Sequence, residues 1–172
     1  MSARFPCAAM ALCLAFSVAA CAFHPLYGRT GSNAAGQQIF HSIYVDPIDA
    51  ERAGYELRNS LIDLLQGADH MDRALYRLKV TVKQTIEGVA VQTNGSITRY
   101  RYTMIADYEL SNARTGADVT KGVETTVSAY DVVASPYATL VAQQDAQKLG
   151  ARDIADRIRI DLGVYFARHA GS

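Results

Sequence analysis

Cysteine is scarce in this sequence, and every cysteine lies near its start. The chain has 172 residues and three cysteines, and no cysteine follows the third, Cys21. If the chain is cleaved before Cys21, the product keeps a single cysteine and cannot form an internal disulfide, even in a compartment that permits disulfides. The sequence therefore excludes a disulfide-stabilised scaffold and a cysteine-rich metal site.

A charge excess and a long apolar run are missing as well. Lysine and arginine together number 17, as do aspartate and glutamate, so the net charge is zero. A general nucleic-acid-binding protein usually has a basic excess, so we predict no nucleic-acid partner. The run from Phe5 to Ala20 is shorter than the roughly 20 apolar residues that a membrane-spanning helix needs, and no other stretch is long enough.

Motifs of catalysis and cofactor binding are also absent. The four histidines are scattered and have no cysteine partners at metal-ligand spacing: His24, His41, His70 and His169. There is no glycine-rich phosphate loop, and no serine lies in a nucleophile-elbow context. We predict a protein that is not an enzyme and holds no metal or cofactor. An enzyme whose site is assembled from residues distant in sequence stays an alternative, which a deep pocket with convergent polar groups would favour.

The start of the chain has the pattern of a secretory signal over residues 1–20. Arg4 precedes a short apolar core without acidic residues, and three small residues come directly before Cys21. This order resembles the bacterial lipobox, in which the cysteine carries an S-diacylglycerol and an N-acyl chain such as palmitate. Two or more acyl chains give stable membrane attachment, so we expect a lipid anchor at Cys21. A plain signal peptide followed by a chance cysteine is the alternative.

Residues 21–37 are expected to tether the lipid anchor to a folded domain. The stretch from Gly28 to Gln37 is rich in glycine, serine, asparagine and alanine, a composition typical of flexible linkers. Residues 38–172 are long enough for a single domain with a core of its own. Ala22 stands where an aspartate is associated with retention at the inner membrane, so by analogy we expect an outer-membrane lipoprotein that faces the periplasm.

The domain is predicted to begin with a strand and a helix. The strand is expected over residues 39–48 and is stopped by Pro47. Apolar residues at three- and four-residue steps then predict a helix from about Ala50. Asp49 is its expected cap, and Gly67 its expected end.

Three strands are expected next, because apolar and polar residues alternate along each of them. The first two cover residues 76–86 and 98–110, and Asn94-Gly95 indicates a hairpin between them. The segment "NARTG" is expected to turn the chain after the second strand. The inner face of the third strand is expected to consist of Val119, Val123, Val127 and Ala129.

Matching apolar side chains across the hairpin predicts its register. The tightest loop would pair Val82 with Asp107, whereas a slip of one residue pairs Val82 with Tyr108 and restores the apolar match. We therefore expect a three-residue loop or a bulge, with Gly88 as the bulge site. In this register Lys83 would face Asp107.

A long helix is expected to complete the domain. Ser135 at the cap and Pro136 in the first turn predict its start, and it should run to about Arg168. Asp153 and Arg157 are spaced to form an ion pair along it. Two helices can cover one face of the sheet and leave the other polar. The predicted fold class is α+β with two layers: a four-stranded, largely antiparallel or mixed sheet with two helices on one face.

Four stretches of the sequence together resemble a known family. They are "CAFHPLYG", "IYVDPI", "LRNSLIDLL" and "SAYDVVASPYATLVAQQDAQ". In this order they resemble the lipopolysaccharide-assembly lipoprotein LptE of Gram-negative bacteria, in its alphaproteobacterial form. The resemblance implies a lipoprotein that sits as a plug inside a large outer-membrane β-barrel, LptD, helps this barrel to assemble, and takes part in moving lipopolysaccharide to the cell surface. An auxiliary lipoprotein of an ABC-type lipid transporter is the alternative.

The hairpin tip is the candidate site for lipopolysaccharide. Lipid A presents phosphates, which favour arginine and lysine, beside acyl chains, which favour apolar surface. In the predicted register Arg99 and Arg101 would face two valines near the tip, and Lys83 lies further along the same face. Tyr130 is an expected neighbour. Ordinary solvent-facing basic residues are the alternative interpretation.

Overall fold

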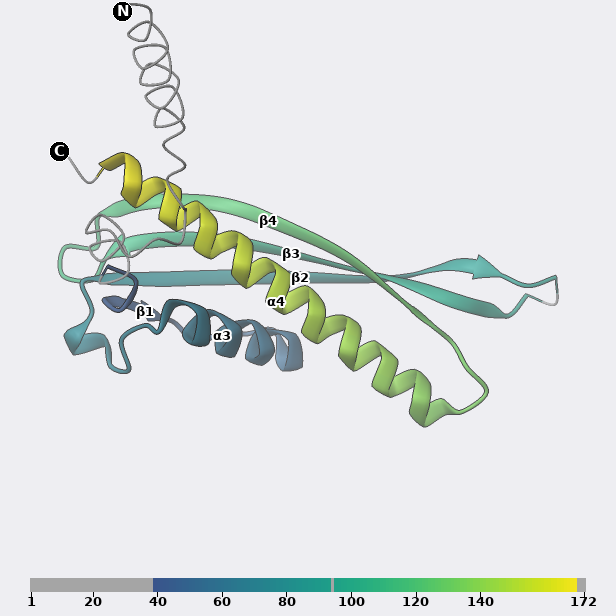
Figure 1. The fold of residues 1–172 in the computed structure, drawn as a ribbon. Helices are drawn as coiled ribbons and strands as arrows, with labels where there is room; N and C mark the ends of the chain where they lie inside the picture. Colours follow the sequence, from purple (N-terminus) through teal and green to yellow (C-terminus); the bar gives the residue numbers. More distant parts are fainter. Residues whose placement is uncertain (1–38, 94, 170–172) are drawn as a thin grey trace, which may run out of the picture. The chain divides into compact units, whose positions relative to one another are not determined.

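The computed structural model describes residues 39–93 and 95–169. The predicted signal over residues 1–20, the predicted anchor Cys21 and the predicted tether over residues 21–37 lie outside the described residues. The elements follow in the order β1 (Ile43–Val45), α3 (Glu51–Leu65), the short 3-10 helix η2 (Met71–Arg73), β2 (Tyr76–Val91), β3 (Ile97–Asn112), β4 (Asp118–Asp131) and α4 (Pro136–His169) (Figure 1). The predicted order of strands and helices is confirmed.

The four strands form one sheet in the order β1-β2-β3-β4. β1 is parallel to β2, and the other neighbours are antiparallel, so the sheet is mixed as predicted. The two helices pack against one another and share one face of the sheet (Figure 1). The predicted α+β fold with two layers is confirmed.

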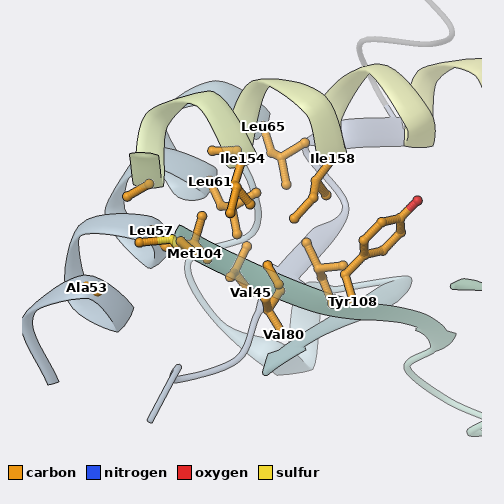
Figure 2. Packing of buried hydrophobic residues seen from close by; sticks show 14 of the residues in the cluster. Val45, Ala53, Leu57, Leu61, Leu65, Val80, Met104, Tyr108, Ile154 and Ile158 are labelled. Carbon is orange, nitrogen blue, oxygen red and sulfur yellow. The ribbon is translucent and has the colours of Figure 1, made fainter. Parts of the chain in front are cut away.

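The core lies between this inner sheet face and the two helices. Fully buried side chains from three elements lie close together here (Figure 2). They are Leu57 and Leu61 of α3, Ile154 and Ile158 of α4, and Met104 of β3. Truncating a buried leucine or isoleucine to alanine typically costs about 2–5 kcal/mol. The three- and four-residue spacing along α3 therefore places this face of the helix in the core.

The ends of the first strand and helix differ from the prediction. The strand is shorter than expected, because β1 contains only residues 43–45 and the chain is helical at Ile39 and Phe40. Asp49 does not cap α3: Ala50 occupies the cap position and makes no side-chain hydrogen bond. The helix ends at Leu65, and Gln66 in the left-handed conformation is its C-cap in place of the expected Gly67.

The start of α4 and its internal ion pair are confirmed. The Ser135 hydroxyl oxygen accepts a hydrogen bond from the backbone N–H of Ala138 at 3.4 Å, and Pro136 is the first helical residue. Further along, the Arg157 guanidinium lies 3.2 Å from the Asp153 carboxylate. The cap and the proline thus set where this 34-residue helix begins.

The register of the β2–β3 hairpin differs from the predicted one by two residues. Val82 lies opposite Ala106, not Tyr108, although apolar residues still face apolar residues. The backbone N–H of Gln92 donates to the Ser96 carbonyl, and Gly95 has φ +84°. A three-residue loop needs a left-handed residue at its last position, so Gly95 sets where the loop ends and hence the register. The predicted bulge is confirmed, since the pairing shifts between Gly88 and Ala90.

The two faces of β4 are exchanged relative to the prediction. Val123 and Val127 are 59% and 60% exposed, and Ala129 is exposed as well. Of the expected inner set, Val119 alone packs against the core. The inner face consists instead of Gly122, Glu124, Thr126, Ser128 and Tyr130, and of these Glu124, Thr126 and Ser128 contact α4.

Polar contacts with α4 explain this exchange. The Thr126 hydroxyl donates to the Asp153 carboxylate at 2.8 Å, and the Ser128 hydroxyl donates to the Ala146 carbonyl at 3.3 Å. A Cβ atom on Gly150 would lie only 3.1 Å from Thr126 Cγ2, so the helix approaches the strand closely here. Small residues and hydrogen bonds therefore replace the apolar contacts that we expected in this part of the inner layer.

Candidate functional site

The outer face of the sheet carries the basic residues that the sequence analysis selected. The β2–β3 hairpin extends away from both helices (Figure 1), and its side chains near the tip are exposed. Arg99 and Arg101 both point outward from β3, as predicted, and Lys83 points outward from β2. The structure therefore places the three residues on one face.

Each of the two arginines is paired with a carboxylate. Arg101 lies directly opposite Glu87, with 3.9 Å between the charged groups, and Arg99 lies opposite Asp131 at 3.4 Å. The expected β2 neighbours were valines, but the observed register places Glu87 opposite Arg101 and Ala90 opposite Arg99. Asp131 belongs to β4, on the other side of Arg99. Exposed ion pairs contribute about 0–1 kcal/mol each, so an anionic ligand could exchange with these carboxylates at low cost.

Lys83 is also close to a carboxylate, although not in the expected way. Its direct cross-strand partner is Ile105, and its amino group reaches diagonally to Asp107 at 3.9 Å. The lysine side chain is 74% exposed. Its charge is therefore balanced locally and remains open to solvent.

Apolar and aromatic groups complete the tip. Val91 is 64% exposed, and Ile97 covers the space that a Gly88 side chain would occupy. Tyr130 stacks on Tyr100 with ring centroids 5.5 Å apart, but on the inner face. Burial raises the pKa of Tyr130. Tyr130 of β4 thus lies beside the part of β3 that carries Arg99 and Arg101, as expected. Its side chain, however, is on the opposite face of the sheet from theirs.

The sequence analysis did not predict a polar network on the inner face of the sheet. The Tyr108 hydroxyl donates to the Asp161 carboxylate at 3.0 Å, and Glu124 lies beside the same carboxylate. The Tyr108 ring fills the space over Gly122, where a Cβ atom would come within 2.7 Å of it. A glycine inside a strand is a signal of such close approach, and Gly122 could have indicated it.

The described surface has shallow hollows on the sheet and beside α3. One of about 350 Å³ lies over β2, β3 and β4 and is lined by Lys79, Thr81, Asp107, Tyr108, Glu109, Lys121, Gly122 and Val123. Another of about 280 Å³ lies at the end of α3 and is lined by Phe40, His41, Leu64, Leu65, Gln66 and Arg159.

Within residues 39–93 and 95–169, no group of three histidine, cysteine or acidic side chains could hold a metal ion. None of the helices in this part of the chain combines the length and apolar character needed to cross a membrane.

Solved structures of bacterial lipoproteins share this fold. A protein of Caulobacter crescentus CB15, described as a lipoprotein, is 29% identical, with a TM-score of 0.66 over 78% of this chain and 97% of that chain. A minor lipoprotein from Acinetobacter baumannii is 15% identical, with a TM-score of 0.53 over 72% of this chain and 92% of that chain. The rare lipoprotein B from Shewanella oneidensis is 11% identical, with a TM-score of 0.54 over 75% of this chain and 97% of that chain.

A family model makes the assignment specific. The model described as LptE, lipopolysaccharide-assembly, matches residues 40–162. The chain therefore belongs to the LptE family of lipopolysaccharide-assembly proteins. The family resemblance predicted from the sequence is confirmed. A comparison with curated protein sequences gave no match.

Proposed function

We propose that this LptE-family chain is an outer-membrane lipoprotein that plugs a large β-barrel translocon of the LptD type. In this role it helps the barrel to assemble and takes part in moving lipopolysaccharide to the outer leaflet. The observation that carries the proposal is the outer sheet face, on which Lys83, Arg99 and Arg101 each lie beside a carboxylate. Large barrels have polar interiors, and such a charge-balanced face suits a water-filled lumen.

The open edges of the sheet also support a position inside a barrel. β1 pairs only with Tyr76–Leu78, so the described part of the chain leaves the rest of β2 without a neighbour on that side. β4 is the other edge strand. Long open edges promote aggregation unless something covers them. Barrel walls around the domain would shield both edges.

A mild-detergent pull-down tests the proposal. The acylated, tagged full chain should recover one outer-membrane β-barrel of the LptD type, identified by mass spectrometry. Depletion of the lipoprotein should leave this barrel misassembled and the outer membrane permeable to hydrophobic antibiotics. Recovery of an inner-membrane ABC complex instead, with the barrel unaffected by depletion, would support the auxiliary-transporter alternative and refute the plug.

Direct binding of lipopolysaccharide at the hairpin tip is the second part of the proposal. Phosphates of lipid A would replace the carboxylates beside Arg99 and Arg101, and Lys83 would add a third cation. The double variant Arg99→Glu/Arg101→Glu should weaken binding of purified lipopolysaccharide at least tenfold with an unchanged melting temperature. Arg114→Glu, in the exposed turn after β3, is the matched control and should bind normally. Equal binding by the double variant and the control would remove the arginines from the site.

A further inference from the structure

Polar side chains join the middle of β4 to α4. The apolar residues of β4 that pack against the core are Val119 and Tyr130, which lie near the two ends of the strand. Between them, the Thr126 hydroxyl donates to the Asp153 carboxylate of α4 at 2.8 Å. Because no apolar side chain of β4 holds this middle part against the helix, its attachment depends on polar contacts.

Helix and strand spacing place Glu124 inside this contact. Four helical residues rise about 6 Å and two strand residues about 6.7 Å, so a row of side chains on α4 can match a row on β4. The helix row is Asp153, Arg157 and Asp161, and the strand row is Thr126, Glu124 and Gly122. Thr126 contacts Asp153 at one end. At the other end Tyr108, which covers Gly122, donates to Asp161 at 3.0 Å. Glu124 therefore lies between two carboxylates.

The charges in this contact do not balance. Arg157 is its cation, and the guanidinium lies 3.2 Å from Asp153. Within the described residues Arg157 forms no ion pair with Glu124 or Asp161. The Tyr108 hydroxyl has one proton, which it donates to Asp161. Two ionised carboxylates side by side repel one another, whereas one shared proton removes a charge and lets a carboxyl group donate to its neighbour.

The surroundings of Glu124 favour its protonated form. Burial raises the pKa of Glu124, the hydrogen bond to Asp161 and its negative charge raise it further, and Arg157 opposes the shift. Burial and the bond to Asp161 also raise the pKa of Tyr108, so this hydroxyl stays a donor. A carboxyl pKa that is higher in the folded state stabilises the contact at low pH, and this contribution is lost as the pH rises through the folded pKa.

We infer that Glu124 and Asp161 form a proton-dependent latch between β4 and α4. With a proton shared between the two carboxyl groups the latch is closed. When the proton leaves, two negative charges face one another, and the middle of β4 separates from α4 more often. This part of β4 can open locally, because β4 is an edge strand and its Val123 and Val127 side chains face away from the core. The latch is a property of the domain and does not depend on the proposed function.

Hydrogen exchange at pH 5 and pH 8 tests the latch in the acylated full chain, with no barrel present. Protection factors of the amides in β4 and in the facing part of α4, corrected for the intrinsic rate at each pH, should fall about threefold or more from pH 5 to pH 8. Glu124→Gln should keep the wild-type pH 5 protection at both pH values. The control Glu109→Gln, on the outer face of β3, should show the same fall as the wild type.

Two results of this experiment would overturn the latch. One is an equal fall in the wild type and in Glu124→Gln, and the other is low protection of Glu124→Gln at both pH values. Carbon NMR titration of the wild-type Glu124 carboxyl needs no variant. A midpoint above the ordinary glutamate value of about 4.3 supports the latch, and a midpoint at or below it overturns the latch. Because neither measurement involves the barrel, the latch can fail while the proposed function stands.

Discussion

Glu124 lies on the inner face of β4 beside Asp161 of α4. Burial raises the pKa of Glu124, and the hydrogen bond to the Asp161 carboxylate and the negative charge of this group raise it further. The positive charge of Arg157 opposes the shift. A raised carboxyl pKa means that the folded state binds a proton more tightly than the unfolded state does. Glu124 therefore contributes most to stability at low pH, and this contribution is lost as the pH rises through its folded pKa.

The substitution Glu124→Gln should stabilise the domain at pH 7. Glutamine keeps a hydrogen-bonding side chain beside Asp161 without a negative charge, and we expect a gain of up to about 1 kcal/mol in the free energy of unfolding, because the site is partly open to solvent. The gain should shrink toward pH 4, where the wild-type carboxyl is protonated as well. Thermal unfolding at both pH values measures it, with Glu109→Gln on the outer face as the control. An equal gain at pH 4 and pH 7 would contradict the charge explanation.

At the scale of elements, α4 and β4 are joined at a point of close approach. Gly150 faces Thr126 and Tyr102, and a Cβ atom there would lie 3.1 Å and 3.5 Å from their side chains. The glycine lowers intrinsic helix stability by about 1 kcal/mol relative to alanine, but it lets the helix come near the strand. The contact also buries Tyr102, whose pKa burial raises to about 12. Gly150 thus lowers the intrinsic stability of α4 but allows α4 to pack closely against β4.

A larger side chain at Gly150 should separate the two elements. Gly150→Leu should lower the free energy of unfolding by about 1–3 kcal/mol, because the new side chain would overlap Thr126 and Tyr102. Chemical denaturation followed by circular dichroism measures this change. Leu149→Ala, at the neighbouring exposed position of the same helix, should change the free energy by less than about 0.5 kcal/mol. Equal stability of Gly150→Leu and the wild type would contradict the close approach of α4.

At the scale of the whole molecule, we propose that a lipid anchor holds the folded domain at the membrane. The described domain presents one core face and one wet, charge-balanced face. Two or more acyl chains would hold the protein at the membrane surface without a spanning helix. A tether over residues 21–37 would then let the domain enter a barrel lumen while its lipid stays in the bilayer.

The anchor can be tested by a single substitution. Cys21→Ser should abolish acylation and prevent cleavage by the lipoprotein-specific peptidase, because the thiol is the first acylation site of a lipobox. Metabolic labelling with a fatty-acid probe measures acylation, and the shift in mass measures cleavage. Cys13→Ser leaves the thiol in place and should be labelled normally. Label retained on the Cys21→Ser protein would contradict the lipobox interpretation.

Local signals in the sequence determined the elements and their order. Ser135 and Pro136 set the start of α4, since a cap and a first-turn proline act through neighbouring backbone groups. The alternation along β2 and β3 predicted which residues share a face, since this period is a property of the strand itself. Gly88 marked the bulge. The Arg99 and Arg101 side chains also point outward, as the alternation predicted.

Only the tertiary structure decided which face of β4 is covered and what the arginines contact. Alternation divides a strand into two faces, but in β4 the face with Val123 and Val127 is exposed and the more polar face is covered by α4. Thr126 faces the core because Asp153 of α4 accepts its hydrogen bond and Gly150 leaves room for it. The pairing of Arg101 with Glu87 follows from a register that the left-handed Gly95 sets. These outcomes depend on partners that lie far away in the sequence, and such partners meet only when the sheet and its helices pack together.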